Sequence, residues 1–215
     1  MRTDVREAIL DAVDRRLARF GYKKMTVEGL AEEAGIGKGT VYLHFPSKEE
    51  AVLSHVDRIV ERLCGRLDTI EAGGGPVDRR IHSMLVERVT YRLSAVQHYT
   101  QSLDDLLSAI RPMLLERRVR HFAREADCFE RVLNEGRRTE VFEPVRVPTT
   151  ARALVEATNA LLPYSLSPQE LGDLAGVRRR VVAIADLLVG GLRASPRGDR
   201  GRSMSVASSP ARTSA

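Results

Sequence analysis

The stretch from residue 26 to residue 50, TVEGLAEEAGIGKGTVYLHFPSKEE, constrains the fold of this chain more than any other part. It opens on Thr26, a capping residue, and then places apolar side chains on one helical face. Gly35 follows as a residue that can adopt the left-handed conformation at a helix end, and a second short helix is expected over 37–45. Two short helices joined by so tight a turn must cross steeply, which favours a DNA-binding helix-turn-helix.

The second short helix carries side chains suited to nucleic acid. Gly37 and Gly39 remove side chains where the backbone can approach DNA closely. Val41 and Phe45 are four residues apart and can anchor the opposite face to a core. Polar groups able to donate to base edges or phosphate oxygens follow one another on the outward face: Lys38, Thr40, Tyr42 and His44.

A third helix start follows directly. Pro46 ends the second short helix, and Ser47 with Glu50 forms a capping box for the next one. Lys48 then lies in a first turn, where free backbone N–H groups and an ammonium group can both meet a phosphate.

These residues resemble the signature of the tetracycline-repressor (TetR) family, roughly T-x-x-x-[IL]-A-x-x-A-G-[VI]-x-x-G-T-x-Y-x-H-F-x-S-K-E. The resemblance implies a dimeric, all-helical bacterial regulator whose N-terminal head binds a palindromic operator and whose larger body senses a small molecule. It also implies phosphate contacts from four residues: Thr26, Tyr42, His44 and Lys48. The implied groove-facing stretch is Gly37, Lys38, Gly39 and Thr40. Gly37 stands where many members carry a serine, so this chain offers no hydroxyl there.

The periodicity of the whole chain predicts an all-α fold. A first helix over 4–20, closed by Gly21, completes the head, and a long helix from Ser47 to about residue 71 links head and body until the run at 73–76 stops it. Further helices are expected at 77–100, 102–110, from Pro112 to Gly136, from Thr149 or Thr150 to Leu162, and from Ser167 to Leu192. The predicted units are a DNA-binding head at 1–50, an effector-binding and dimerisation body at 51–192, and a disordered basic tail at 193–215.

Composition and charge limit the classes of function. No apolar run reaches membrane-spanning length and no secretory leader is evident, so a cytoplasmic protein without membrane contact is expected. The formal net charge of +5 lies mostly in the tail, so the case for DNA rests on the motif. Cys64 and Cys128 lack metal-type spacing, the five histidines are scattered, and no nucleotide-binding or hydrolase motif occurs. We therefore predict no metal, no cofactor and no catalytic site.

Several body residues are candidates for lining an effector pocket, which is typically apolar with a few polar groups. Plain core packing is the competing explanation for each. The set is Tyr91, His98, Tyr99, Met113, Phe122, Phe129, Asn159 and Tyr164. Their character favours an apolar or amphipathic effector. The arginines of the 117–124 run fit a solvated helix face, with an anion site as the alternative.

The resemblance to the TetR family implies a homodimer interface built by the last two helices of each subunit, and small residues on these helices are compatible with it. The alanine-rich face of 150–162 and the group Ala183, Ala185, Gly190 and Gly191 allow close helix approach, with internal packing as the alternative. The combined prediction is a repressor that binds double-stranded operator DNA as a dimer and is released by a small molecule. A non-specific or architectural DNA-binding protein and a helical-bundle enzyme are the alternatives.

Overall fold

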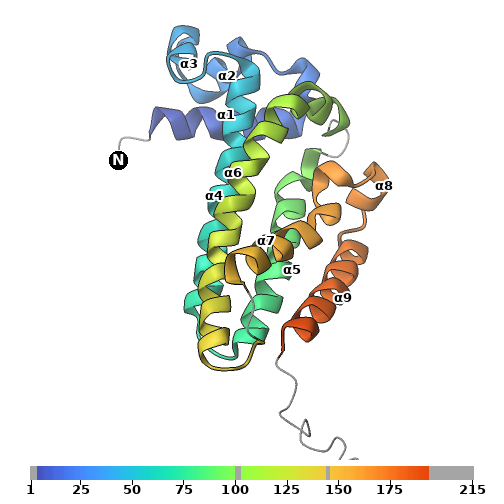
Figure 1. The fold of residues 1–215 in the computed structure, drawn as a ribbon. Coiled ribbons are helices and arrows are strands. Elements are labelled where there is room, and N and C mark those ends of the chain that lie inside the picture. The colour runs from blue at the N-terminus through green and yellow to red at the C-terminus, as the bar shows by residue number, and fades with distance from the viewer. Residues whose placement is uncertain (1–3, 100–102, 144–145, 194–215) are drawn as a thin grey trace, which may run out of the picture.

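The computed structural model describes residues 4–99, 103–143 and 146–193, and its regular structure in these ranges is helical (Figure 1). The all-α prediction is confirmed. The α-helices are α1 Val5–Lys24, α2 Val27–Ala34, α3 Lys38–His44, α4 Lys48–Ala72, α5 Val77–Val96, α6 Leu103–Arg138, α7 Val147–Ala157, α8 Pro168–Leu171 and α9 Leu174–Leu192. Single 3-10 turns are η1 Gln97–Tyr99, η2 Asn159–Leu161 and η3 Pro163–Ser165. Among the described residues, no helix is long and apolar enough to span a membrane.

The head consists of α1, α2 and α3, and α2 begins and ends at the capping residues that the sequence predicts. The Thr26 hydroxyl accepts a hydrogen bond from the Gly29 N–H at 3.1 Å and so caps α2. Gly35 has φ of 68° and ends α2 in the left-handed conformation. Gly21, at φ 72° and ψ 171°, breaks α1 as expected, but a further helical stretch continues to Lys24.

Two long helices connect the head to the rest of the molecule. Figure 1 shows α4 and α6 running side by side from the head toward the opposite end. One hydrophobic cluster joins α1–α3, the first turns of α4 and the near ends of α5, α6 and α9. A second cluster fills the far half between α4, α5, α6, α7 and α9. Cys64 and Cys128 are free thiols buried in this second cluster.

The predicted break at Pro112 is wrong, because α6 continues through it as a helix of 36 residues. A proline inside a helix removes one backbone hydrogen bond and crowds the preceding turn. Burial on both sides offsets that cost here. Leu106 and Ile110 are held in the first cluster, and Phe129 and Leu133 are held in the second.

The C-terminal elements differ from the prediction in their boundaries. The helix expected from Thr149 or Thr150 starts earlier, at Val147, with Pro148 in its first turn, and it ends at Ala157, before the 3-10 turns. Ser167 and Glu170 do form a reciprocal capping pair, but the helix that they start stops at Leu171.

The last long helix has its own start and end. The Asp173 carboxylate accepts a hydrogen bond from the Gly176 N–H at 2.7 Å and caps α9. After α9, the Arg193 guanidinium lies 2.6 Å from the Asp78 carboxylate on α5. The rest of the predicted tail lies outside the described residues.

Candidate DNA-binding surface and ligand cavity

The eight residues predicted to contact DNA lie on α3, in the first turn of α4 and at the N-caps of α2 and α3. Six are exposed: Thr26, Gly37, Lys38, Gly39, Tyr42 and His44. Thr40 and Lys48 are half-buried. Val41 and Phe45 are buried, so the inward and outward faces of α3 follow the predicted pattern.

Lys38 has a partner in the same surface. Its ammonium forms an ion pair with Glu28 of α2 and lies 5.7 Å from the centre of the Tyr42 ring. The hydrogen bond to Glu28 raises the pKa of Lys38 and lowers the pKa of the Glu28 carboxyl. Lys38 must exchange this carboxylate for a phosphate or a base edge if it is to contact DNA.

Lys48 is oriented by the end of α1. Its ammonium donates to the Tyr22 carbonyl oxygen at 3.4 Å and lies 4.1 Å from the centre of the Tyr22 ring. The Tyr22 hydroxyl in turn donates to Glu49 at 2.6 Å, and burial together with this carboxylate raises the pKa of Tyr22. A cation is thereby held beside the start of α4.

Only one half of the predicted capping box forms at the start of α4. The Ser47 hydroxyl accepts a hydrogen bond from the Glu50 N–H at 3.1 Å. The Glu50 carboxylate does not turn back to Ser47, because the Arg117 guanidinium of α6 holds it at 2.5 Å. A long-range ion pair has replaced the local contact that the sequence spacing favoured.

Leu43 was absent from the predicted contact residues. It projects from α3 with 86% of its surface exposed, between the exposed side chains of Tyr42 and His44. Its position between two outward-facing polar residues could have predicted that Leu43 is exposed. Its apolar type made it look like a core residue.

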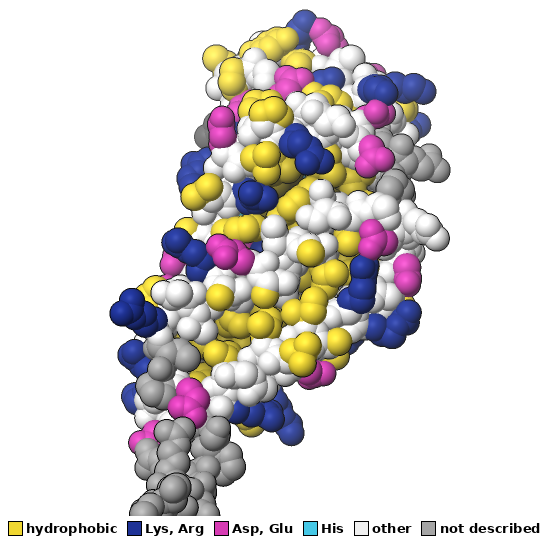
Figure 2. All heavy atoms as spheres, turned by 45° about the vertical axis from the view of Figure 1, so that its right-hand side comes forward, with side chains coloured by type: hydrophobic (Ala, Val, Ile, Leu, Met, Phe, Trp, Pro, Cys, Tyr) yellow, Lys and Arg dark blue, Asp and Glu magenta, His cyan; other side chains and the backbone are white. Residues whose placement is uncertain are grey.

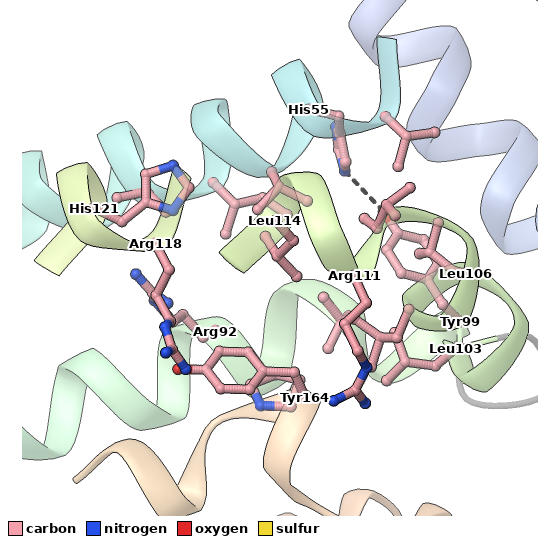
Figure 3. Close-up of a pocket in the computed structure, with 18 of the residues that line it drawn as sticks. His55, Arg92, Tyr99, Leu103, Leu106, Arg111, Leu114, Arg118, His121 and Tyr164 are labelled. Carbon is pink, nitrogen blue, oxygen red and sulfur yellow. Dashed lines mark hydrogen bonds between the residues drawn. The ribbon is translucent and has the colours of Figure 1, made fainter. Parts of the chain in front are cut away.

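A cavity of about 100 Å³ lies where the head meets the body (Figure 3). Its walls come from α1, α4, α5, η1, α6 and η3. The apolar lining is Leu17, Val52, Val56, Ile59, Val60, Val96, Leu103, Leu106, Leu107, Ile110, Leu114, Leu115 and Pro163. The polar lining is His55, Arg92, Tyr99, Arg111, Arg118, His121 and Tyr164.

Two of the eight residues predicted to line a pocket, Tyr99 and Tyr164, do line this cavity. Three of the others belong to the cores: Phe129 is completely buried, and Met113 and Phe122 pack against the clusters.

The remaining three predicted pocket residues do not line the cavity and have polar or cationic partners. Tyr91 lies 5.2 Å from the Arg66 guanidinium, and His98 lies 3.2 Å from the Asp14 carboxylate. Asn159 accepts a hydrogen bond from the Tyr164 hydroxyl. Helical periodicity identifies inward-facing positions, but it does not distinguish those that face a void from those that face another side chain.

A polar network separates the cavity from the surface of α1. The Tyr99 hydroxyl donates to Asp14 and lies 3.0 Å from His55 Nε2. Arg58 contacts His55 Nδ1 at 3.1 Å and the Asp11 carboxylate at 2.7 Å. Burial lowers the pKa of His55 to about 4, against the opposing charge of Asp14, so the imidazole is neutral at pH 7. The network fixes α1 against α4 and η1.

A second polar contact joins α4 to α6. Arg117 bonds to both Glu50 and Asp57, and the His121 ring lies 2.7 Å from the same Asp57 carboxylate. Partial burial acts to raise the pKa of Asp57, but the hydrogen bond from His121 and the charge of Arg117 leave it below its ordinary value. The residues that begin α4 are therefore tied to the helix that forms one wall of the cavity.

The outer face of α7 and α9 is apolar and built from small residues. Leu187 of α9 is 77% exposed, and small residues of both helices are exposed as well: Ala153 and Ala157 of α7, and Ala183, Gly190 and Gly191 of α9. Figure 2 shows hydrophobic side chains gathered in the middle of the lower half of this view, whereas Lys and Arg side chains also lie in the middle of its upper half. Ala185 was predicted for this face, but it is completely buried in the chain's own second cluster.

Comparison with known proteins agrees with the helix-turn-helix. Residues 9–54 match the family of bacterial regulatory proteins, tetR family. An uncharacterized HTH-type transcriptional regulator of Haemophilus influenzae is 34% identical over 67 residues, which are 31% of this chain and 36% of that protein. The HTH-type transcriptional repressor KstR of Mycolicibacterium smegmatis is 32% identical over 80 residues, 37% of this chain and 39% of that protein. The matches thus span less than half of either relative.

Solved structures extend the likeness of fold to the body. A transcriptional regulator from Cytophaga hutchinsonii superposes with a TM-score of 0.73 at 18% identity, over 87% of this chain and 98% of that one. A TetR transcription regulator from Haloarcula marismortui gives 0.62 at 19% identity, over 86% and 97%. Residues 9–54 thus match the tetR family of bacterial regulatory proteins, and the described chain as a whole shares the fold of solved transcriptional regulators.

Proposed function

We propose that this chain is a ligand-responsive transcriptional repressor that binds a palindromic operator as a homodimer. The observation that carries the proposal is the exposed surface of α3 beside the start of α4. It offers Lys38, Tyr42, His44 and Lys48 as donors, while Val41 anchors the helix from behind. A second helix of a helix-turn-helix lies in the major groove when it carries such an outward face.

The DNA contacts are tested by a salt titration with an operator obtained by selection from random sequences. Lys48→Ala should reduce the slope of log K against log salt by about 0.9, the value for one lost phosphate contact. Arg138→Ala, at an exposed position in the last turn of α6, is the matched charge control and should leave the slope unchanged. An unaltered slope in Lys48→Ala would remove this residue from the DNA contacts, and the lack of a protected site in footprinting would favour a non-specific binder.

We assign the dimer interface to the outer face of α7 and α9. A palindromic operator needs two recognition helices held about 34 Å apart, so a twofold assembly is part of the proposal. Exposed Leu187 with small residues around it supports close packing against a second copy. Operator binding should therefore depend on protein concentration in the way that a dimer requires.

We infer that ligand in the cavity releases DNA, because the cavity touches elements of the head. Leu17 belongs to α1, and Val52 and His55 belong to the first turns of α4, close to Lys48. A ligand changes the DNA-binding equilibrium only through a difference in its affinity for the two arrangements. Widening the cavity would move α4 and with it the spacing of the recognition helices. DNA and ligand should then lower each other's affinity by the same factor, which titrations in both orders measure.

A further inference from the structure

One side of the cavity is cationic. Arg92 of α5 and Arg118 of α6 converge beside the hydroxyl end of the Tyr164 ring, and Arg111 lies toward the other end of that ring (Figure 3). The remaining walls are mostly leucine, isoleucine and valine side chains. The cavity therefore has one polar end and one apolar end.

The positive charge at this end is not balanced by the protein. Glu125 is completely buried and accepts hydrogen bonds from both Arg88 and Arg92, so one carboxylate serves two guanidinium groups. Arg88 also donates to the Thr158 hydroxyl at 2.7 Å. One buried nitrogen of Arg88 and the Nε of Arg92 have no hydrogen-bond partner among the described residues. A buried donor without a partner is costly, and Arg92, unlike Arg88, lines the cavity, so its Nε favours an acceptor from outside the chain.

Arg118 adds a second cation without a carboxylate. Within the part of the chain that the structure describes, no Asp or Glu oxygen lies within 4 Å of its guanidinium or of that of Arg111. Arg118 is half-buried, with its guanidinium 5.6 Å from the centre of the Phe122 ring. The nearby His121 is already paired with Asp57. Arg92 and Arg118 thus lie together as charged groups facing the same void.

We propose that the cavity binds a single aliphatic chain ending in an anionic oxygen head group, a carboxylate or a phosphate. The head group lies between Arg92 and Arg118 beside Tyr164, since guanidinium groups bind such oxyanions through paired hydrogen bonds. The aliphatic chain of the ligand extends along the apolar wall formed by Leu103, Leu106 and other leucines. This assignment rests on the proposed role of the cavity as the effector site.

The size of the cavity gives the ligand a means to act. Its volume of about 100 Å³ is below the roughly 300–1,000 Å³ of typical ligand sites, so an aliphatic chain enters only if the walls separate. Two of those walls are α4 and α6, and Arg117 ties these helices together next to the DNA-binding surface. The anionic head group of the ligand is attracted by the arginines, and its aliphatic chain moves α4 and α6 apart.

The test uses four ligands of one chain length and the full-length protein. Decanoate, decyl phosphate, decanol and decyltrimethylammonium are titrated by calorimetry, each below its micelle concentration. The wild type should bind at least one of the two anions about tenfold or more tightly than decanol, and the tighter of the two identifies the head group. Equal or tighter binding of decanol or of the cation would overturn the proposal, and so would binding of none of the four.

Matched variants locate the head group. Arg118→Gln should remove the preference for the anion while keeping the affinity for decanol, and Arg118→Lys should restore part of that preference. Arg120→Gln, exposed on the same helix and outside the lining, should behave as the wild type. Retention of the full preference in Arg118→Gln would refute the placement. Operator binding without ligand is measured separately. If the wild type without ligand does not bind an operator, the DNA-binding function is refuted. If the anion binds the protein but does not release the operator, only the effector role is refuted.

Discussion

The buried carboxylate of Glu125 offers the sharpest test of how the body is held together. Its side chain has no exposed surface, and it accepts from Arg88 Nε at 2.5 Å and from Arg92. Glu125→Gln preserves the shape but removes the charge and places an NH₂ group against a guanidinium. Two buried cations then remain without a counter-ion.

The expected cost follows from measurements on other buried ion pairs. Removing one partner of such a pair costs about 3–5 kcal/mol, because the remaining charge stays buried without compensation. For a chain of 150–250 residues, each kcal/mol lowers the midpoint of thermal unfolding by roughly 2–4 °C. Glu125→Gln should therefore lower the midpoint by about 6–20 °C.

The assay is thermal unfolding followed by circular dichroism, at one fixed protein concentration because dimerisation adds to apparent stability. Glu116→Gln, an exposed position on the same helix, is the control and should change the free energy of unfolding by less than about 0.5 kcal/mol. Adding Arg92→Met to Glu125→Gln should recover part of the loss, since it removes one of the two uncompensated charges. A fall of less than about 2 °C in Glu125→Gln would refute the reasoning.

Three further predictions concern the head, the buried histidine and the dimer. Glu28→Gln should tighten operator binding in shift assays, because it frees Lys38 and removes a negative charge from the surface that faces phosphates. Burial lowers the pKa of His55 from its ordinary 6.5 to about 4 in the folded chain, so the unfolded chain binds this proton more readily. The contribution of His55 to stability should therefore fall by about 3 kcal/mol as pH drops from 6.5 to 4. Denaturant titrations of His55→Gln should lack that fall. Leu187→Glu should give folded monomers in sedimentation, whereas Ala185→Glu should unfold the chain, since only the first position is exposed.

The helices of the head, and with them the exposed face of α3, could be predicted because their determinants are local. Hydroxyl caps at Thr26 and Ser47, the left-handed glycine at 35 and apolar side chains at helical spacing act within a few residues of one another. Pro112 was misleading because its effect depends on whether distant residues hold both sides of the helix. The same reason explains why Glu50 leaves its capping box for Arg117.

The cavity could be predicted only in character. Its apolar walls and its tyrosines follow from the composition of the body, and two of the eight predicted pocket residues, Tyr99 and Tyr164, line this cavity. The cationic end of the cavity was harder to predict from the sequence. The arginines of the 117–124 run fit a solvated face, and only the structure shows Arg118 turned toward Arg92 from another helix. A void is a property of several helices packed together, so no single periodic stripe encodes it.

The first hydrophobic cluster limits how such a chain can be recombined. Ala51, Val52 and Leu53 at the start of α4 belong to one core with Leu93 of α5 and Leu103 of α6. A hybrid made by joining this head to another body at residue 50 would separate side chains that were fitted to each other. A hybrid that keeps its function must therefore include the residues on both sides of that core, and transfer of the head alone would leave part of the core behind.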